Sequence, residues 1–252
     1  MKIVFITGAT SGFGKAIALK FAEHGFHLLL NGRRTERLTA LENEIKSTFN
    51  CKVFSLPLDV RNNADVVSSL NALPHEWKKI DILINNAGLA QGLSTIQEGN
   101  TNDWDVMIDT NIKGLLYISR VIMPWMIEQG SGHIINISSI AGKEAYAKGN
   151  IYCATKHAVD AITKSMRIDM LPHGIKVTAI NPGAAETEFS LVRFKGDAER
   201  AKVVYQGYEP LQAVDIAEVV YFAATRPPNV VLNDITITPL AQANTSHLLR
   251  KT

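Results

Sequence analysis

The chain has 252 residues, of which 46% are hydrophobic and 20% are charged, ordinary values for a globular protein with one substantial core. Its 26 basic and 24 acidic residues leave a formal net charge of +2, which argues against both a nucleic-acid-binding surface and an acidic tail. No apolar run approaches the roughly 20 residues that a membrane span requires.

A few residue types indicate the cellular compartment and whether the chain binds a metal. The apolar run Met1–Ile6 is too short for a signal-peptide core and leads into a turn without a cleavage site. Cys51 and Cys153 offer no disulfide framework, and the 7 histidines are scattered without ligand spacing. We therefore expect a cytoplasmic enzyme or binding protein with reduced cysteines, no metal, and no membrane or nucleic-acid partner.

Short apolar runs recur along the chain and are expected to be strands. Continuous rather than alternating apolarity is typical of strands buried on both faces of a parallel sheet. The runs are Ile3–Ile6, Phe26–Leu30, Val53–Leu56, Ile82–Ile84, His133–Ile137, Lys176–Ile180 and Ile235–Thr238.

Helix-length amphipathic segments lie between these runs. Leu38, Leu41 and Ile45 recur at helical spacing, and Asp215, three residues before a glutamate, favours a helix from Ile216 to Ala224. Repeated strand–helix units imply right-handed crossovers. The prediction is one α/β domain over residues 1–252, a Rossmann-type doubly wound parallel sheet, with a mobile loop around residues 183–210.

A glycine-rich turn, G-x-x-x-G-x-G, directly follows the first expected strand. Glycines permit a tight turn and let the backbone approach a pyrophosphate, while the next helix offers its first amides and the positive end of its dipole. Such a turn can occur without a ligand, but its place after a terminal strand favours nucleotide binding. The residues concerned are Gly8, Thr10, Ser11, Gly12, Phe13 and Gly14.

The second expected strand ends in Gly32, Arg33 and Arg34. NAD-binding folds usually place a carboxylate near this point to accept hydrogen bonds from the ribose hydroxyls. A carboxylate would repel a 2′-phosphate, whereas a guanidinium can bind one through two hydrogen bonds. Surface arginines are usually just solvated, but together with the glycine turn Arg33 and Arg34 favour NADP as the cofactor.

Ser139 follows a strand, and Tyr152 and Lys156 lie four residues apart, on one face of an expected helix. A free tyrosine, with a pKa of about 10, is a poor base at neutral pH. A neighbouring ammonium and an oxidised nicotinamide would favour the phenolate and lower that pKa. Ser139 can donate a hydrogen bond to a substrate oxygen, so Ser139 and Tyr152 are also the expected substrate-binding residues.

With these motifs in order, the chain resembles the short-chain dehydrogenase/reductase family over essentially its full length. The resemblance rests further on Asp59-Val60, Asn85-Asn86-Ala87-Gly88, Asn111, and Asn181-Pro182-Gly183 followed by Thr187.

The resemblance implies a role for each of these residues. Asp59 and Val60 would contact the adenine, and Asn86 would lie along the cofactor. Asn111 would support Lys156 through a water, and Lys156 would also bind the nicotinamide ribose. The nicotinamide end would be held by Pro182, Gly183 and Thr187.

Residues 80–90 and 187–197 are similar to one subgroup, the NADP-dependent serine/L-allo-threonine (3-hydroxy acid) dehydrogenases. The similarity implies reversible oxidation of the 3-hydroxyl of small acids such as L-allo-threonine, serine or 3-hydroxybutyrate. Arg193 and Lys195 are candidates for meeting the substrate carboxylate, although loop charges are more often solvated.

Two other functions stay open at this point. One is a carbonyl reductase for a bulkier ketone or acyl substrate, and the other is a catalytically idle NADP(H) sensor on the same fold. The complete set of Asn111, Ser139, Tyr152 and Lys156 argues against the sensor, because a pure binder needs no proton-transfer residue.

Small residues and the family resemblance together predict that copies of this chain assemble. Ala154, Ala158 and Ala161 would let two copies of their helix approach closely across a two-fold axis. The family resemblance implies a homotetramer.

Overall fold

Seven parallel strands form one sheet in the order β3-β2-β1-β4-β5-β6-β7 in the computed structural model, which describes residues 2–251. Their bounds are β1 Ile3–Ile6, β2 His27–Gly32, β3 Val53–Pro57, β4 Ile80–Asn85, β5 His133–Ile137, β6 Lys176–Pro182 and β7 Asp234–Ile237. The predicted doubly wound parallel sheet is confirmed, and no strand end departs from its apolar run by more than two residues.

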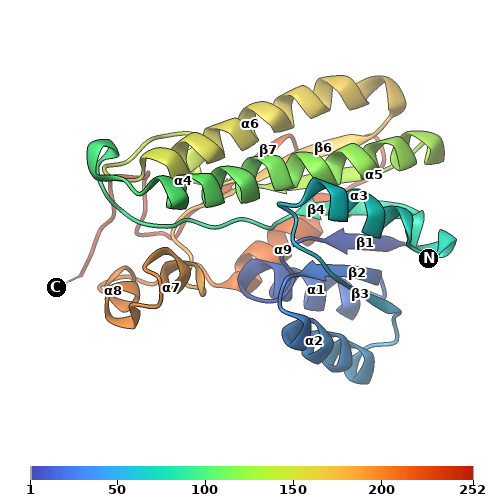
Figure 1. The fold of residues 1–252 in the computed structure, drawn as a ribbon, viewed down its shortest axis with the longest axis horizontal. Coiled ribbons are helices and arrows are strands. Elements are labelled where there is room, and N and C mark those ends of the chain that lie inside the picture. Colours follow the sequence, from blue (N-terminus) through green and yellow to red (C-terminus); the bar gives the residue numbers. More distant parts are fainter. Residues whose placement is uncertain (1, 252) are drawn as a thin grey trace.

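Helices cover both faces of the sheet (Figure 1). They are α1 Gly12–Glu23, α2 Thr35–Thr48, α3 Asn63–Asn71, α4 Thr101–Ile108, α5 Leu115–Gln129, α6 Asn150–Met170, α7 Phe189–Arg193, α8 Ala198–Val203 and α9 Ala213–Ala224. Shorter 3₁₀ turns span His75–Lys78, Ile96–Glu98, Ile140–Gly142 and Leu171–His173, and a π-helical turn spans Asp109–Gly114.

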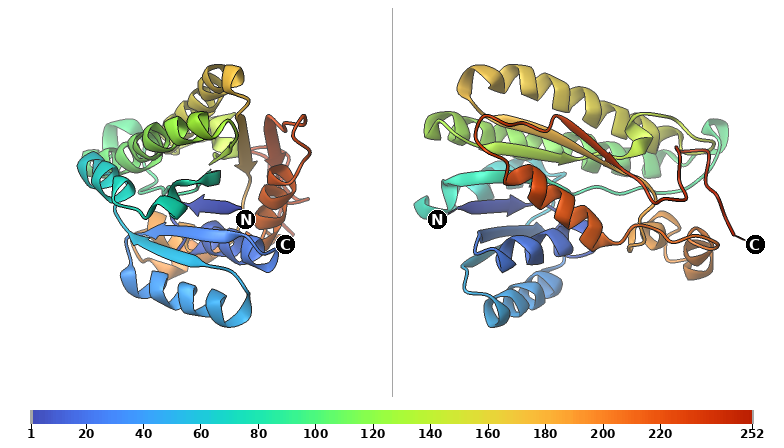
Figure 2. Two further views of the ribbon diagram at one scale, coloured as in Figure 1. Left: turned by 90° about the vertical axis from the view of Figure 1, so that its right-hand side faces the viewer. Right: turned by 180° about the vertical axis from the view of Figure 1, so that it is seen from behind.

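The strands are buried on both faces because successive side chains point into different helical layers. In β1, Val4 and Ile6 pack in the core formed with α1, α2 and α9, whereas Ile3 and Phe5 pack in the core formed with α3, α5 and α6. Two turned views show these layers on opposite sides of the sheet (Figure 2). Burial on both faces explains why the strands read as continuous apolar runs.

The order of the strands reverses between β1 and β4. In an open parallel sheet this reversal separates the crossovers and leaves a crevice at the carboxyl ends of the two strands. The segments that follow β1 and β4 therefore form the floor of a natural binding site.

One local prediction needs correction. Helix α9 begins at Ala213 and not at Ile216, because Asp215 is its third residue and its carboxylate accepts a hydrogen bond from the Gln212 amide (2.7 Å) in a reciprocal capping box. The segment around residues 183–210 contains two short helices, α7 and α8, and its mobility stays a prediction. Within residues 2–251, every helix is too short or too polar to cross a bilayer.

A buried histidine lies at the beginning of β5. The Nε2 atom of His133 is 2.8 Å from the Thr178 hydroxyl on β6, while its Nδ1 atom is buried without a hydrogen-bond partner. Burial, together with the charge of Lys176, lowers the pKa of His133 to about 4. The folded protein therefore keeps this imidazole neutral.

Acid should destabilise the fold through His133. The unfolded chain binds a proton at this residue below about pH 6.5, but the folded chain does so only near pH 4. Stability from this group is complete above pH 6.5 and is lost as pH falls toward 4, by about 3 kcal/mol. Urea unfolding of the wild type and His133→Leu over this range measures the difference, because His27 remains in both proteins. Parallel pH profiles would contradict the assignment.

Candidate active site

A cavity of about 510 Å³ lies at the carboxyl ends of the strands from β1 to β6. Its walls come from the turn after β1, the ends of β2, β4 and β5, one face of α6, and the segment after β6. Of the residues that the sequence nominated for catalysis or for cofactor binding, all line this cavity except Gly14 and Asn111.

The glycine turn has the backbone shape that the sequence predicted. Gly8 (φ +66°) and Gly12 (φ +50°) lie in the left-handed region, and Asn86 secures the turn by donating to the carbonyl of Gly8 (3.1 Å). A Cβ on Gly14 would lie 2.2 Å from the same carbonyl oxygen, so Gly14 lets α1 pack on the turn and does not face the cavity. Ser11 makes no side-chain cap, which leaves the first amides of α1 available to an anion.

Arg34 reaches over the glycine turn. Its Nη2 atom donates to the hydroxyls of Thr10 (3.0 Å) and Ser11 (2.9 Å), and its Nη1 atom pairs with Glu188 (3.3 Å), at the beginning of α7. A Cβ on Gly32 would lie only 2.5 Å from the Thr10 methyl group, so any side chain at this position requires Thr10 to move. The end of β2 thus presents a guanidinium and hydroxyls.

Arg33 is the more exposed of the two arginines. Its side chain is 56% exposed, and its Nη1 atom is 3.9 Å from a carboxylate oxygen of Asp59. Asp59 pairs more closely with Arg61 (2.6 Å), and although burial alone would raise its pKa, hydrogen bonds from Arg61 hold the pKa of Asp59 below its usual range. Arg61 did not appear among the sequence candidates.

The opposite wall comes from the segment after β6. Pro182, Gly183 and Thr187 line it, and a Cβ on Gly12 would lie 3.4 Å from the Cβ of Thr187. The glycine turn and Thr187 therefore face each other across a narrow gap.

Tyr152 and Lys156 are buried side by side on α6. The Lys156 ammonium is 5.9 Å from the centre of the Tyr152 ring and donates to the carbonyl of Ile137 (2.9 Å). The hydroxyl of Ser139 donates to the carbonyl of Pro182 (3.3 Å) and accepts from the amide of Ala141 (3.1 Å). All three functional groups lie on one wall of the cavity.

Burial controls the ionisation of this pair. It raises the pKa of Tyr152, an effect that the hydroxyl of Ser139 and the charge of Arg193 oppose, and it lowers the pKa of Lys156 to about 8. The expected lowering of the Tyr152 pKa is therefore not met by the protein alone, since the loss of hydration outweighs these neighbours.

Asn111 lies behind the cavity wall and not in it. From the π-helical turn, its amide nitrogen donates to the Leu89 carbonyl (2.8 Å) and the Thr155 hydroxyl (3.0 Å), while its oxygen accepts from the Leu89 amide (2.8 Å). The Thr155 contact joins Asn111 to the residue before Lys156, and the water link to Lys156 itself stays an expectation. Asn111 thus holds α6 against the segment after β4.

Arg193 covers the Tyr152 end of the cavity. Its guanidinium carbon is 5.4 Å from the centre of the Tyr152 ring and 5.5 Å from that of Tyr146, whose hydroxyl accepts a hydrogen bond from it. Lys195, the other cation nominated in this segment, pairs instead with Asp103 (2.8 Å) and does not line the cavity.

Sequence reasoning missed several lining residues that come from the last part of the chain. Gln242 accepts a hydrogen bond from the Ala184 amide (2.7 Å), and Thr245, Leu248 and Arg250 also line the cavity. They carry no motif, so only the fold reveals them. Among residues 2–251, no three histidine, cysteine, aspartate or glutamate side chains cluster as metal ligands would.

A sequence profile described as "short chain dehydrogenase" matches residues 2–197. The chain belongs to the short-chain dehydrogenase family. The prediction of this family from the motifs is thereby confirmed. Solved structures of similar proteins have the same fold.

Relatives of this short-chain dehydrogenase have closely matching lengths. The NADP-dependent 3-hydroxy acid dehydrogenase of Salmonella typhi is 45% identical, with 96% of each chain covered. Sulfoacetaldehyde reductase 2 of Chromohalobacter salexigens is 43% identical, covering 96% of this chain and 95% of that protein. A closed form of serine dehydrogenase complexed with NADP+ superposes with a TM-score of 0.92 at 42% identity, covering 99% of this chain and 100% of that one.

Proposed function

We propose that this chain is an NADP-dependent dehydrogenase that oxidises the 3-hydroxyl of small hydroxy acids and hydroxy amino acids, and reduces the corresponding carbonyls in reverse. One observation carries the proposal. A single cavity has Arg34 beside the glycine turn at one end, and Ser139, Tyr152 and Lys156 under Arg193 at the other. The 3-hydroxy acid and serine dehydrogenases among its relatives support this choice.

The residues at the turn fit NADP. Left-handed Gly8 and Gly12 bring the backbone close to a pyrophosphate, and the uncapped start of α1 offers amides to it. Arg34, with the hydroxyls of Thr10 and Ser11, suits a 2′-phosphate. When bound, NADP+ supplies the hydride acceptor.

The side chains on α6 and after β5 would move the proton. Tyr152 would take the proton of the substrate hydroxyl, and Ser139 would donate a hydrogen bond to the same oxygen. Because burial raises the pKa of Tyr152, its phenolate depends on positive charge nearby. Lys156 and Arg193, both within 6 Å of the ring centre, are placed to provide that charge.

Arg193 is the group that we propose for the substrate carboxylate. Its guanidinium is anchored by the Tyr146 hydroxyl and packs over aromatic rings beside Tyr152. A fixed, planar donor of this kind pairs well with a carboxylate. The segment around residues 183–210, which we propose to be mobile, would bring Arg193 over the substrate and exclude water.

We extend the proposal to the assembly and its compartment. Ala154, Ala158 and Ala161 lie on the outer face of α6, exposed or half-buried, where a second copy could pack in a homotetramer. Cys51 and Cys153 are both free thiols, which agrees with a reducing compartment such as the cytoplasm.

Tyr152→Phe should abolish most turnover while keeping the cofactor bound. Loss of general acid–base catalysis typically costs roughly 10²- to 10⁴-fold in rate. Steady-state kinetics gives the rate, and NADPH fluorescence titration checks that the cofactor still binds. Near-normal turnover in a folded variant would refute the role of Tyr152. A wild type that binds NADPH but turns over no alcohol or carbonyl would favour the idle sensor.

Arg34→Ala should weaken the preference for NADP+ over NAD+. The loss of a charge-assisted contact to phosphate corresponds to roughly 10- to 100-fold in kcat/KM. A smaller effect is expected for Arg33→Ala, because that side chain is 56% exposed. Arg37→Ala is the matched control, since Arg37 also pairs with Glu188 but does not line the cavity. A wild type that prefers NAD+ would overturn the cofactor assignment.

Substrates with a carboxylate should react much faster than neutral ones. Initial rates for L-allo-threonine, L-serine and 3-hydroxybutyrate are compared with those for a neutral secondary alcohol of similar size. Arg193→Met should lower kcat/KM for the acids by a further factor of roughly 10 to 100 relative to the neutral alcohol. An equal loss of kcat/KM for the acids and for the neutral alcohol would instead show that Arg193 acts through Tyr152. Equal wild-type turnover of the neutral alcohol would favour a carbonyl reductase for other ketones.

A further inference from the structure

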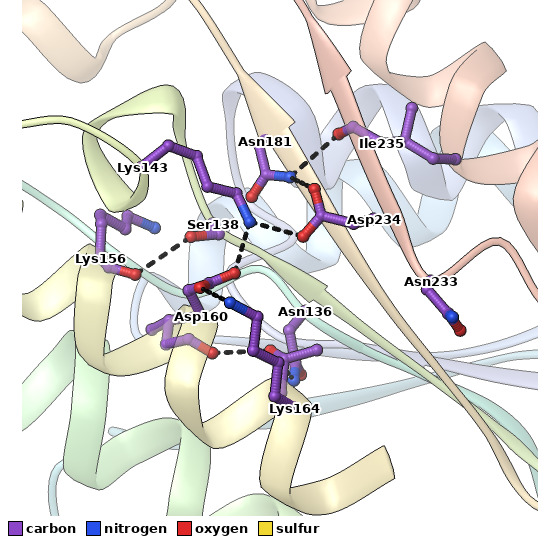
Figure 3. Close-up of polar contacts among 12 residues, drawn as sticks. Asn136, Ser138, Lys143, Lys156, Asp160, Lys164, Asn181, Asn233, Asp234 and Ile235 are labelled. Atoms are coloured by element: carbon purple, nitrogen blue, oxygen red, sulfur yellow. Dashed lines mark hydrogen bonds and ion pairs between the residues drawn. The ribbon is translucent and has the colours of Figure 1, made fainter.

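Lys143 lies outside the cavity but joins the turn after β5 and α6, which help to build it, to the neighbouring strand β7 (Figure 3). Its ammonium is 2.5 Å from Asp160 on α6 and 2.5 Å from Asp234 at the beginning of β7. The Asp160 side chain is 12% exposed, against 30% for Lys143 and 36% for Asp234, so the network is half-buried at α6 and exposed at β7.

On one side the network leads back to Ser139. The side-chain amide of Asn181 donates a hydrogen bond to Asp234 (2.8 Å). Pro182 follows Asn181 in the chain, and its carbonyl accepts a hydrogen bond from the Ser139 hydroxyl (3.3 Å). Lys143 itself directly follows the 3₁₀ turn Ile140–Gly142 that begins after Ser139. The chain and these contacts form a closed loop around Ser139.

On the other side the network holds the same turn against α6. A Cβ on Gly142 would lie 2.6 Å from the carbonyl oxygen of Lys156, and the Ser138 hydroxyl donates to this oxygen (3.3 Å). Asp160 lies one helical turn beyond Lys156. The ion pair between Lys143 and Asp160 therefore links the turn to α6 close to the point where their backbones touch.

The charges explain why a cation is needed at this point. Asp160 and Asp234 approach the same ammonium, and without it two carboxylates would face each other. Like charges at this range repel, and α6 and β7 would then be pushed apart at the turn. Asp160 keeps a second partner, Lys164 (2.7 Å), but Lys164 contacts neither the turn nor β7.

We infer that Lys143 is a positioning residue, which fixes the Ser139 turn against α6 so that the Ser139 hydroxyl and the Tyr152 phenol address one substrate oxygen. The inference rests on the proposed function for its chemistry, but the placement of the turn can be measured without any substrate. Lys143 itself does not line the cavity.

Lys143→Met tests the inference in two ways. A displacement of the order of 1 Å at a reacting group can cost roughly 10²-fold in rate, so kcat should fall about 10- to 100-fold. KM for NADP+ should stay unchanged, because Arg34 and the glycine turn lie outside the network. Amide hydrogen exchange of residues 139–147 should become faster than in the wild type.

Lys164→Met is the matched control, because it removes one ammonium from the same carboxylate. It should leave both kcat and the exchange of residues 139–147 unchanged. Lys143→Arg should recover most of the activity, since a guanidinium can reach both carboxylates, and Lys143→Gln should recover less. Circular dichroism and the melting temperature establish that each variant is folded.

The outcomes separate the two proposals. Unchanged kcat and unchanged exchange in folded Lys143→Met would overturn the positioning role, as would equal losses in Lys164→Met. If Lys143→Met does not fold, full kcat in Lys143→Gln would overturn it. A wild type inactive on all hydroxy acids would overturn the proposed function alone, because faster exchange in Lys143→Met, absent from Lys164→Met, would still support the placement.

Discussion

The site depends on a close approach of two backbones where the strand order reverses. The turn after β1 meets the end of β4 so closely that a Cβ on Gly8 would lie 2.9 Å from the Cα of Ala87. Asn86 fastens the contact by donating to the carbonyls of Thr7 (2.9 Å) and Gly8 (3.1 Å). From this fixed point, α1 can begin at Gly12 with its first amides toward the crevice, and α6 can lie across the far side.

The chemistry in the crevice is governed by the loss of hydration. Tyr152 and Lys156 are both nearly inaccessible to solvent, and burial shifts each toward its neutral form. A charge added or removed near such a pair strongly changes the pKa values of both groups, because little water remains to screen it. The positive charge of Arg193, from a segment distant in sequence, opposes the rise in the pKa of Tyr152, but burial outweighs it.

Much of the fold could be predicted because double-sided burial leaves a continuous apolar signal in each strand. Most of the family motifs also located the cavity, because they follow the carboxyl ends of strands, whereas Tyr152 and Lys156 reach it from α6. The predicted start of α9 was wrong because Asp215 caps the helix from its third position. A sequence pattern does not distinguish this geometry from an N-cap. Asn111 was predicted to act in catalysis and Gly14 in cofactor binding, but neither lines the cavity, and each supports its wall from behind.

Other residues could not be found from sequence at all, because their roles depend on contacts between distant segments. Glu188 meets Arg34 across 154 positions, and Lys143 meets Asp234 across 91. In the linear sequence each is an isolated surface charge, and such charges are usually solvated. Only the pairing of β7 with β6, against which α6 packs, makes Lys143 different from Lys164.

The tight fit between Gly32 and Thr10 has a consequence for how cofactor preference could evolve or be redesigned. An acidic residue at position 32, the simplest route toward NAD, would bring its Cβ to 2.5 Å from the Thr10 methyl group. The methyl group must therefore turn aside or be removed, and turning it would also move the hydroxyl that Arg34 uses, whereas serine at position 10 would keep that hydroxyl. A single substitution at position 32 thus disturbs the Arg34 contact as well as changing the charge at the end of β2.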